Sequence, residues 1–347
     1  MHYRAMSYSR IFNKISVVLS ALVLIAAFCA CNSEKPFQHY EGLCWGTTFH
    51  MTYESNVRLD DSIQRVLKEV DMSLSPFNEN SVISKINAGS SDSTDLMFRT
   101  VFAESVRLNK ISNGTFDPTI APIIDLWGFG PMGDIDTAPT REQIDSAMKS
   151  VGITECFIDS LNHITKKTPE TQFNFSAIAK GFGCDMLAEM LERNGVKNFI
   201  IEIGGEVVVR GLSPRHTEWR VMIDAPIPGN DTIIHDGMAV IDVDSCAIAT
   251  SGNYRNYNCI DSINVIGHTM NPLTGEPAKS SMLSATIIAP TCMLADALAT
   301  ACMILPLDSA MEMIDKIPDV DALFVTQMGD DGKWMVHTTA GFPAIHR

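Results

Sequence analysis

Two residues near the C-terminal end of the chain, Asp296 and Thr300, have side chains that could bind a metal ion. They are four residues apart in an alanine-rich segment, so a helix would place both on one face. Carboxylate and hydroxyl oxygens are hard donors, and Mg²⁺ takes few such protein ligands and completes its shell with phosphate and water. The pair is therefore a candidate Mg²⁺ site. A local hydrogen bond between the two side chains is the alternative interpretation.

A lysine with small neighbours marks a second candidate site, for an anion. Lys180 lies in the segment 174–185, where alanine and glycine surround the predicted start of a helix. Small residues allow a ligand to approach the backbone, and the free amides of a first helical turn bind anions. A lysine beside them adds a point charge suited to phosphate. The alternative is an ordinary helix N-terminus with an exposed lysine.

Three segments are predicted to be loops that could present polar groups. Residues 114–119 (Gly-Thr-Phe-Asp-Pro-Thr), followed by Trp127, indicate a rigid turn beside aromatic side chains. Residues 249–255 and 267–275 are predicted to be loops that close strands, and His268 lies in the second of them. A histidine there could act as a general base, and a structural role in the turn is the alternative.

One pattern is excluded as a dinucleotide-binding motif. Residues 128–133 are Gly-Phe-Gly-Pro-Met-Gly and so match G-x-G-x-x-G. That motif needs a strand before it and a helix that begins inside it, and Pro131 with the acidic residues that follow provides neither. The segment is therefore predicted to be a loop.

Helical periodicity and capping patterns predict the helices that hold these residues. Five helices are predicted. The first begins after residues 60–62 and the second begins at Thr140 with a capping box. The other three cover residues 177–194, 292–305 and 307–317. The third of these carries Lys180 and stops at Gly195, and the fourth carries both candidate metal ligands.

From Asn198 to Pro290 the chain changes character, because short β-rich runs dominate it. These runs cover 199–203, 207–209, 219–223, 238–241, 263–266 and 285–288, and a closing hairpin is predicted around residues 329–332. Hairpin-like spacing favours an antiparallel sheet over a doubly wound parallel one. The predicted fold class is α+β, with antiparallel sheets and helices packed on one side.

The N-terminal segment has the pattern of an export signal. Basic residues without acidic ones precede the apolar run 15–28, which is shorter than the roughly 20 residues that a spanning helix needs. A small residue then precedes Cys31, as in bacterial lipoprotein signals. We expect residues 1–30 to be the signal peptide, Cys31 to be lipidated, residues 31–41 to form a tether and residues 42–347 the domain. Simple cleavage and an uncleaved anchor are the alternatives.

Composition limits the classes of partner. The chain has 26 Lys and Arg, 41 Asp and Glu, and a formal net charge of −15, with no basic stripe, so no nucleic acid is expected as a partner. The cysteines after Cys31 are odd in number and include no C-x-x-C pair, so we expect free thiols. The length suggests two intimately associated subdomains, and one large domain is the alternative.

The order of the motifs is more specific than any one of them. The motifs are Trp45-Gly46-Thr47-Thr48, Leu74-Ser75-Pro76-Phe77, residues 114–119 with 127–130, Ala179-Lys180-Gly181, Ile203-Gly204-Gly205-Glu206, residues 249–252, 268–275 and 295–300. In this order they resemble the ApbE family, the FAD:protein FMN transferases, from Gly46 to about His337. The resemblance implies an ApbE-like, T-fold-like α+β fold, a flavin pocket built from these loops, and a lipid anchor facing the periplasm or cell exterior.

The resemblance also implies a set of site residues. Positions that match FAD contacts are Trp45, Phe77, Thr115, Phe116, Asp117, Asn174, Lys180 and Met270. Positions that match Mg²⁺ ligands are Asp296, Thr300 and the backbone carbonyl of Ala177. Asn174 stands where the family commonly has Asp, and Trp45 stands where it has Met. Neither departure removes a metal ligand, so activity is expected to survive.

The implied activity is transfer of the FMN half of FAD. A threonine or serine hydroxyl of another exported or membrane protein attacks the phosphorus on the riboflavin side, and AMP leaves. Alignment and charge neutralisation dominate such catalysis, with Mg²⁺ as Lewis acid and Lys180 offsetting charge. His268 and Asp296 are both candidates for the general base. Two alternatives stay open: a hydrolase that forms FMN and AMP, and a lipid-anchored flavin carrier without turnover.

Overall fold

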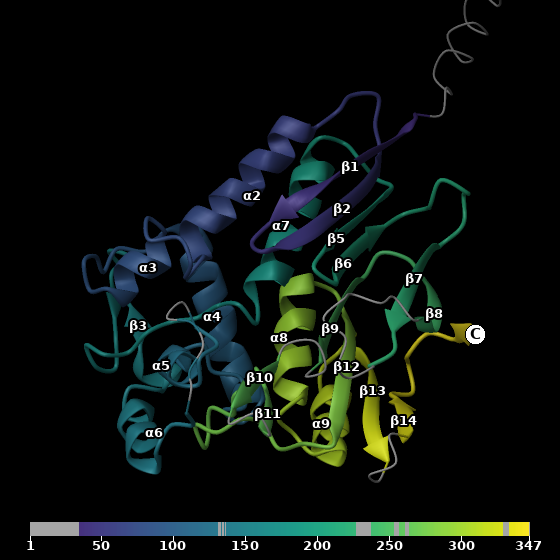
Figure 1. Cartoon of the computed structure of the whole chain (residues 1–347). Helices are drawn as coiled ribbons and strands as arrows, with labels where there is room; N and C mark the ends of the chain where they lie inside the picture. The colour runs from purple at the N-terminus through teal and green to yellow at the C-terminus, as the bar shows by residue number, and fades with distance from the viewer. Residues whose placement is uncertain are drawn as a thin grey trace, which may run out of the picture.

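An eight-stranded sheet is the largest element of the fold (Figure 1). The computed structural model describes residues 35–130, 133, 135, 137–226, 237–252, 257–260, 264–328 and 333–346. In spatial order the strands are β1 (Phe37–Cys44), β2 (Thr47–Glu54), β5 (Phe199–Ile203), β6 (Glu206–Arg210), β9 (Ala247–Gly252), β12 (Met282–Ala289), β13 (Asp321–Met328) and β14 (Lys333–Thr338). Every neighbouring pair in this order is antiparallel.

Three smaller sheets accompany the large one in the described part of the chain. Their strands are β15 (Ile345–His346), β8 (Gly237–Val243) and β7 (Trp219–Asp224) in the first, β10 (Tyr257–Ile260) and β11 (Asn264–Gly267) in the second, and β3 (Phe157–Ile158) and β4 (Ile164–Thr165) in the third. The β7–β8–β15 sheet packs on one face of the large sheet through a shared apolar cluster.

The helices lie on the opposite face of the large sheet (Figure 1). They are α2 (Asp60–Leu74), α3 (Val82–Asn87), α4 (Leu96–Ile111), α5 (Ala121–Leu126), α6 (Arg141–Met148), α7 (Ala179–Arg193), α8 (Cys292–Cys302) and α9 (Leu307–Asp315), with the short 3₁₀ helix η1 (Ile153–Glu155). Helices α7 and α8 contact each other and the sheet directly, and α2 and α4 pack on them. The two helices predicted to carry the site are therefore central.

Alternate side chains of the central strands face these two layers. On β13, Phe324 packs on the helical side, whereas Leu323 and Val325 pack on the small sheet. A strand points successive side chains to opposite faces, and here both faces are covered. Central strands such as β6 are therefore almost continuously apolar, in place of the alternation of a half-exposed strand.

Helix α8 is buried on nearly every side because it lies between the sheet and other helices. Its N-cap, Thr291, accepts a hydrogen bond from the Leu294 amide at 3.4 Å. A helix that is apolar all round is expected to be buried. Its many alanines keep the helix thin, so that strands and helices can approach it closely, and Asp296 is the one charged residue within it.

A small hydrophobic cluster beneath α5 and α6 positions one of the predicted loops. It contains Ile123, Trp127, Ile144 and Met270. The Trp127 indole N–H donates to the Gly275 carbonyl at 2.9 Å, which fastens the loop after β11 to α5. Met270 is thereby held in a buried position.

Much of the predicted architecture is confirmed. The α+β class, the antiparallel sheet and the placement of helices on one side of it agree with the structure. Helix α6 begins with the predicted capping box at Thr140, and Gly195 follows α7 with a φ of +73°. Strand β5 has the predicted bounds, and β13 and β14 form the predicted closing hairpin, whose turn lies outside the described residues.

The predicted tether of residues 31–41 is wrong at its C-terminal end. Strand β1 begins at Phe37, and its pairing with β2 starts at Phe37 opposite Glu54. His39 and Glu41 are exposed on one face of this strand, while Tyr40 packs against the main core. An edge strand with polar residues on its solvent side therefore has the composition of a linker. The folded domain begins at Phe37, before the predicted boundary at residue 42.

The prediction of a loop over residues 249–255 is also wrong where the structure describes it. Residues 247–252 form β9, which lies between β6 and β12 in the middle of the sheet. Its sequence, Ala-Ile-Ala-Thr-Ser-Gly, has few residues that favour strands. Small side chains are required here because α8 packs directly on this strand. Residues 253–255 lie outside the described part.

Other predictions fall beyond the described residues. The signal peptide, Cys31 and residues 131 and 132 of the predicted loop 128–133 are among them. None of the helices in the described part is both long and apolar enough to cross a membrane. The six described cysteines are free thiols, as predicted, and four of them are buried. The division into two subdomains stays a prediction.

Candidate active site

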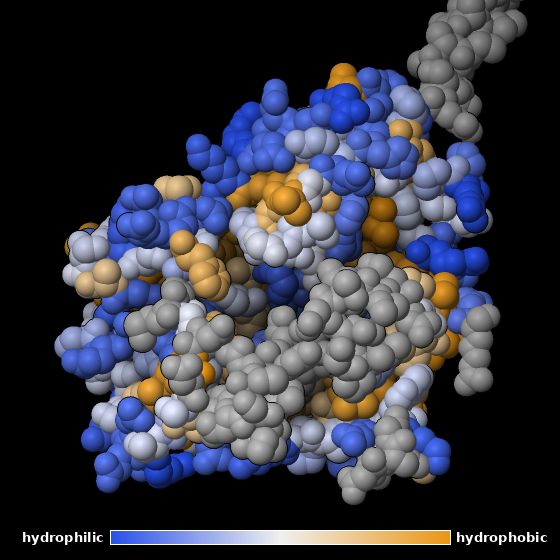
Figure 2. All heavy atoms as spheres, in the orientation of Figure 1, coloured by the Kyte–Doolittle hydropathy of each residue, from blue (hydrophilic) through white to orange (hydrophobic). Residues whose placement is uncertain are grey.

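One cavity of about 1420 Å³ brings the predicted site residues together. Its lining includes Trp45, Phe77, Thr115, Phe116, Asp117, Asn174, Ala177, Lys180, His268, Met270, Asp296 and Thr300. Pockets for drug-sized ligands are usually ~300–1,000 Å³, so this one suits a larger molecule such as a dinucleotide. Figure 2 shows a hollow in the middle of one face, with hydrophobic side chains along its upper rim and hydrophilic atoms deeper within.

The first turn of α7 is capped by a carboxylate from another helix. Gly181 donates its backbone N–H to Asp296 Oδ2 at 3.0 Å. The first amides of a helix have no partner within the helix, and no side chain at the N-cap of α7 provides one. Because this amide is directed to Asp296, the Ala177 carbonyl four residues earlier accepts no backbone hydrogen bond within the described part. Asp296 and Ala177 both line the cavity near the start of α7.

Helix α7 in turn caps α8. The carboxylate of Asp185 accepts the backbone N–H groups of Cys292 and Met293, both at 2.8 Å. Burial raises the pKa of Asp185 to about 6, although these two hydrogen bonds act in the opposite direction. A carboxylate at a helix N-terminus satisfies orphan donors and complements the helix dipole. The two helices therefore fix each other's N-terminal turns at the cavity.

Glycine at position 181 is required by the close contact of these helices. A Cβ atom there would overlap the Cys292 carbonyl oxygen and lie 2.8 Å from Asp296 Cβ. The obstructing carbonyl belongs to the backbone of α8, so it cannot be displaced by a rotamer change. The small residues in this segment were predicted to let a ligand approach the backbone, whereas at Gly181 the group that approaches is the backbone of α8.

Three charged side chains lie together at the base of the cavity. The Lys180 ammonium is 3.1 Å from Glu206 Oε1 and 3.8 Å from Asp296 Oδ1. Burial and the neighbouring Asp296 raise the pKa of Glu206, whereas the Lys180 ammonium beside it acts in the opposite direction and favours the carboxylate. Burial alone would lower the pKa of Lys180, but the two carboxylates raise it, so the lysine stays charged. Two buried carboxylates share one ammonium, which leaves an excess of negative charge that favours a further cation.

The oxygen donors near this charge fit Mg²⁺. Thr300 Oγ1 is 3.3 Å from Ser251 Oγ of β9, and no side-chain hydrogen bond joins the Thr300 hydroxyl to the Asp296 carboxylate within the described part, contrary to the alternative interpretation of that pair. Glu206 Oε2 is buried without a hydrogen-bond partner there. No group of three or more His, Cys, Asp or Glu among the described residues could hold a metal ion. The donors are one carboxylate with hydroxyl and carbonyl oxygens, which suits an ion that also takes phosphate and water.

Trp45 is wedged between two helices at the cavity wall. It forms the two-residue β1–β2 turn with Gly46, and both residues have positive φ, at +50° and +78°. Its indole N–H donates to the Leu67 carbonyl of α2 at 3.2 Å. On the α7 side, a Cβ atom at Gly183 would overlap the indole ring. The Trp45 side chain therefore has a defined place beside the predicted flavin pocket.

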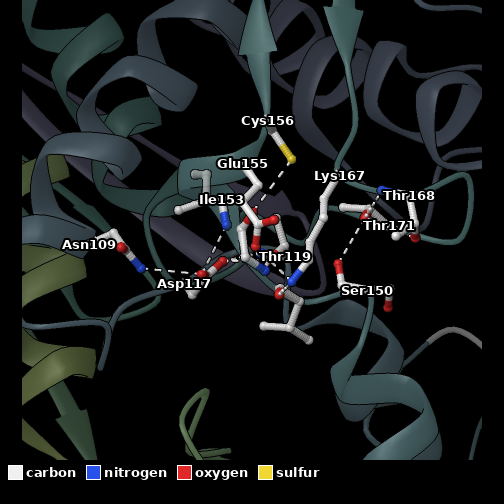
Figure 3. A network of polar contacts seen from close by, with 12 residues as sticks. Asn109, Asp117, Thr119, Ser150, Ile153, Glu155, Cys156, Lys167, Thr168 and Thr171 are labelled. Atoms are coloured by element: carbon white, nitrogen blue, oxygen red, sulfur yellow. Dashed lines mark hydrogen bonds and ion pairs between the residues drawn. The ribbon is translucent and has the colours of Figure 1, made fainter.

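Asp117 lines the cavity, but its carboxylate is bonded to the protein (Figure 3). Oδ1 accepts from the Thr119 hydroxyl at 2.5 Å and the Thr119 amide at 2.9 Å. Oδ2 accepts from the Ile153 amide at 3.1 Å and Asn109 Nδ2 at 3.2 Å. Burial raises its pKa, and these hydrogen bonds oppose the shift. Its carboxylate thus shapes the turn of residues 114–119, and a FAD contact from these oxygens stays a prediction.

Asn174 connects that turn to the start of α7. Its backbone N–H donates to the Pro118 carbonyl at 2.7 Å, and its side-chain Oδ1 accepts from the Ser176 backbone N–H at 2.8 Å. An amide oxygen performs this second bond as a carboxylate oxygen would. The local structure therefore tolerates Asn at this position, and what differs from an Asp is the charge.

The remaining predicted residues lie around the mouth and walls of the cavity. Phe77 is 68% exposed, in contrast to Phe116 and Met270, which are buried. His268 lies in the loop after β11, with its ring 6.5 Å from that of Phe129 in an edge-to-face arrangement. An exposed aromatic side chain at a cavity mouth is suited to cover a bound planar ring.

Sequence reasoning missed three residues that build the site: Glu206, Ser251 and Asp185. Glu206 belongs to a motif that carried the resemblance, but no role followed from its position after two glycines. Ser251 lay in a segment predicted to be a loop, and Asp185 in the interior of a predicted helix. Their roles depend on contacts between elements far apart in sequence, which no local pattern reveals.

Comparison with known proteins identifies close relatives. The ApbE family model matches residues 45–324. An FAD:protein FMN transferase from Vibrio cholerae is 33% identical over 310 residues, which cover 86% of this chain and 90% of the relative. One from Escherichia coli is 30% identical over 342 residues, which cover 93% of this chain and 95% of the relative.

Solved structures agree in fold. The flavin transferase ApbE from Vibrio cholerae superposes with a TM-score of 0.77 at 29% identity, covering 88% of this chain and 99% of that one. The apo flavinyl transferase ApbE from Pseudomonas stutzeri gives a TM-score of 0.77 at 27% identity, covering 89% and 96%. The resemblance predicted from the ordered motifs is thereby confirmed, and the chain belongs to the ApbE family.

Proposed function

We propose that this protein is an FAD:protein FMN transferase, the activity named for its relatives in Vibrio cholerae and Escherichia coli. The observation that carries the proposal is the meeting of Lys180, the first turn of α7 and the oxygens around Asp296 at the base of one large cavity. The Lys180 ammonium there suits a pyrophosphate, and Trp45 and Phe77 on the walls suit a flavin ring.

Mg²⁺ is part of the proposal. Asp296, Thr300 and the Ala177 carbonyl would hold it, since each lines the cavity and offers a hard oxygen. When bound, Mg²⁺ neutralises charge on the pyrophosphate oxygens and helps to fix their orientation. The excess negative charge of the Asp296–Glu206–Lys180 group supports a cation at this place.

In the proposed reaction a threonine or serine hydroxyl of the acceptor attacks the phosphorus on the riboflavin side of FAD. The new bond joins that oxygen to the FMN phosphorus, the bond between this phosphorus and the bridging oxygen breaks, and AMP leaves. The Lys180 ammonium offsets charge on the phosphates. The hydroxyl proton passes to a base.

His268 is the better candidate for that base. Asp296 has one oxygen bonded to the Gly181 amide, and its other oxygen is 3.8 Å from the Lys180 ammonium and is a proposed metal ligand. A carboxylate whose oxygens are committed to a backbone amide and a metal ion is poorly placed to take up the hydroxyl proton. His268 lines the same cavity from a different element, the loop after β11.

The acceptor and the place of reaction are proposed from the N-terminal sequence. Residues 1–30 resemble a lipoprotein signal, and lipidation at Cys31 would hold the enzyme at a membrane, facing the periplasm or cell exterior. Its acceptor is then an exported or membrane protein. The pocket binds FAD as substrate, and the acceptor hydroxyl reaches it through the cavity mouth.

A gel assay separates transfer from the two alternatives. Detergent-solubilised full-length protein is incubated with FAD, Mg²⁺ and candidate acceptor proteins, and a denaturing gel is inspected for flavin fluorescence. We expect a fluorescent acceptor band that disappears with EDTA. Free FMN without a band would support a hydrolase, and intact FAD would support a carrier.

Asp296→Asn tests the metal assignment in the same assay. The amide oxygen of Asn can still accept the Gly181 N–H, so the start of α7 is preserved while the metal-binding charge is lost. Loss of metal stabilisation is expected to slow labelling at least ~100-fold. Full-rate labelling by this variant with Mg²⁺ as the sole metal would contradict the ligand set.

A further inference from the structure

The Lys180 ammonium lies closer to Glu206 than to Asp296, although it contacts both carboxylates. The charged atoms of Lys180 and Asp296 are 3.8 Å apart, which is beyond hydrogen-bond distance, although both side chains line the same cavity. The Lys180 ammonium is instead bonded to Glu206 Oε1 at 3.1 Å. Asp296 Oδ1 is thus left without a direct hydrogen bond to this lysine, while Oδ2 accepts from the Gly181 amide.

Glu206 can determine where the Lys180 ammonium lies, because it is the carboxylate closest to it. It begins β6 and is 3% exposed, and its Oε2 has no hydrogen-bond partner in the described part of the chain. A buried carboxylate with an unsatisfied oxygen attracts a nearby cation strongly. Without Glu206, the remaining anion closest to the ammonium would be Asp296.

We propose that Glu206 is a positioning residue that holds the Lys180 ammonium away from Asp296 Oδ1 and thereby keeps this oxygen available to a divalent cation. Lys180 and a divalent ion compete for Asp296, since two cations near one carboxylate repel each other. Glu206 and Lys180 then act as one neutral unit. The inference rests on the proposed Mg²⁺ dependence and adds Glu206 to the residues of that site.

A double-variant cycle on metal binding tests this role. Mn²⁺ is the probe, because it accepts the same oxygen donors as Mg²⁺ and its free form is measured by electron paramagnetic resonance. Binding to the FAD-free full-length protein is compared for the wild type, Glu206→Gln, Lys180→Met and the double variant. Competition with Mg²⁺ then gives the relative Mg²⁺ affinities.

The expected effects have opposite signs. Glu206→Gln releases the ammonium toward Asp296 and weakens Mn²⁺ binding about tenfold, whereas Lys180→Met removes the competing cation and strengthens it about tenfold. The double variant removes a neutral unit, so its affinity returns to within about threefold of the wild type. Lys180→Gln replaces Lys180→Met if the latter does not fold, with the same expected direction.

A matched control distinguishes position from charge alone. Glu202→Gln removes one negative charge from the same β5–β6 hairpin, where Glu202 contacts His50 and the Gly205 amide in place of Lys180. This variant is expected to bind Mn²⁺ like the wild type. An equal loss in Glu202→Gln and Glu206→Gln would overturn the proposal.

Two further results decide the outcome. A double variant as weak as Glu206→Gln would show that Glu206 attracts or binds the metal itself, and weaker binding by Lys180→Met would exclude competition. Either result overturns the inference and leaves the transferase proposal intact. Absence of Mn²⁺ binding by the wild type, with or without FAD, would overturn the proposed metal dependence together with the inference.

Discussion

Three acidic residues that line the cavity differ in what their oxygens already contact. Asp117 has both oxygens bonded to protein donors, so its carboxylate maintains a turn. Asp296 has one oxygen bonded to an amide, and Glu206 has one oxygen without a partner within the described part. Buried polar groups are normally satisfied, so the unsatisfied oxygen marks a place where a further group is expected. Residue type alone does not separate these roles.

His268→Asn tests the proposed base at this scale. Asn keeps a polar side chain of similar reach but cannot take a proton at neutral pH, so kcat for transfer is expected to fall by about 100-fold. FAD affinity should change by less than about threefold, because the proposed role concerns the acceptor hydroxyl. Rates from fluorescent labelling and a separate FAD titration measure the two effects.

His163→Asn is the control for that substitution. His163 is an exposed histidine bonded to Asp92 and is absent from the cavity lining. Its replacement is expected to leave labelling unchanged. An unaltered kcat in His268→Asn would remove His268 from the mechanism and return the role of base to Asp296 or to no residue.

At the residue scale, site residues could be predicted from the sequence where their type and spacing alone indicate a chemical role. Asp296 with Thr300 and Lys180 beside small residues are of this kind, and all three line the cavity. Glu206 could not be assigned a role, because its function depends on the 3.1 Å contact with a lysine from another element. The hydrogen bonds of the Asp117 carboxylate to Asn109 and Ile153 could not be predicted either, because they also join separate elements.

At the scale of elements, the contact between α7 and α8 determines the site. Gly181→Ala would place a methyl group against the Cys292 carbonyl of α8 and near Asp296. The helices must then separate, which is expected to lower the free energy of unfolding by about 1–3 kcal/mol. Labelling should fall at least about tenfold, because the Asp296 carboxylate moves with α8. Thermal unfolding and the gel assay measure both effects.

Gly183→Ala on the same helix provides the comparison. The added methyl group would meet the Trp45 indole, a side chain at the cavity wall that can shift. We expect a smaller loss of stability than for Gly181→Ala and a weaker affinity for FAD. Equal losses of stability in the two variants would contradict the view that the backbone contact is the rigid one.

Elements with a strong periodic pattern were predictable, and elements defined by tertiary packing were not. Helix α6 begins at its capping box, and β5 matches its apolar run. Strand β9 was missed because the packing of α8 selects small side chains there, in place of the β-branched residues that favour strands. Strand β1 was missed because its solvent-facing side is polar.

At the scale of the whole molecule, the cavity forms where separate layers meet. Its wall includes the start of α7, Asp296 and Thr300 of α8, the loop after β11 and residues Met222 to Asp224 of β7. These segments come from the helical layer, the loop held by the small hydrophobic cluster of α5 and α6, and the β7–β8–β15 sheet. No continuous stretch of the chain contains the site, which is why single motifs were less informative than their order.

The shorter tether changes what an anchor at Cys31 would do. Because β1 begins at Phe37, residues 32–36 alone separate the predicted lipid from the fold. A fully extended chain spans at most ~3.6 Å per residue, so this linker reaches about 18 Å. An enzyme held so close to a membrane would encounter acceptors in or at that membrane far more often than dissolved ones.

Cys31→Ser tests the anchor and this consequence together. Serine cannot form the thioether that carries the lipid, so the variant is expected to leave the membrane fraction, whereas Cys29→Ser should remain there as the matched control. Labelling of a membrane acceptor should fall about tenfold or more, while labelling of a dissolved acceptor should be unchanged, because the cavity is untouched. Fractionation and flavin fluorescence of the two acceptors measure this. If Cys31→Ser stays in the membrane, the apolar run 15–28 is an uncleaved anchor and lipidation is not what holds the enzyme.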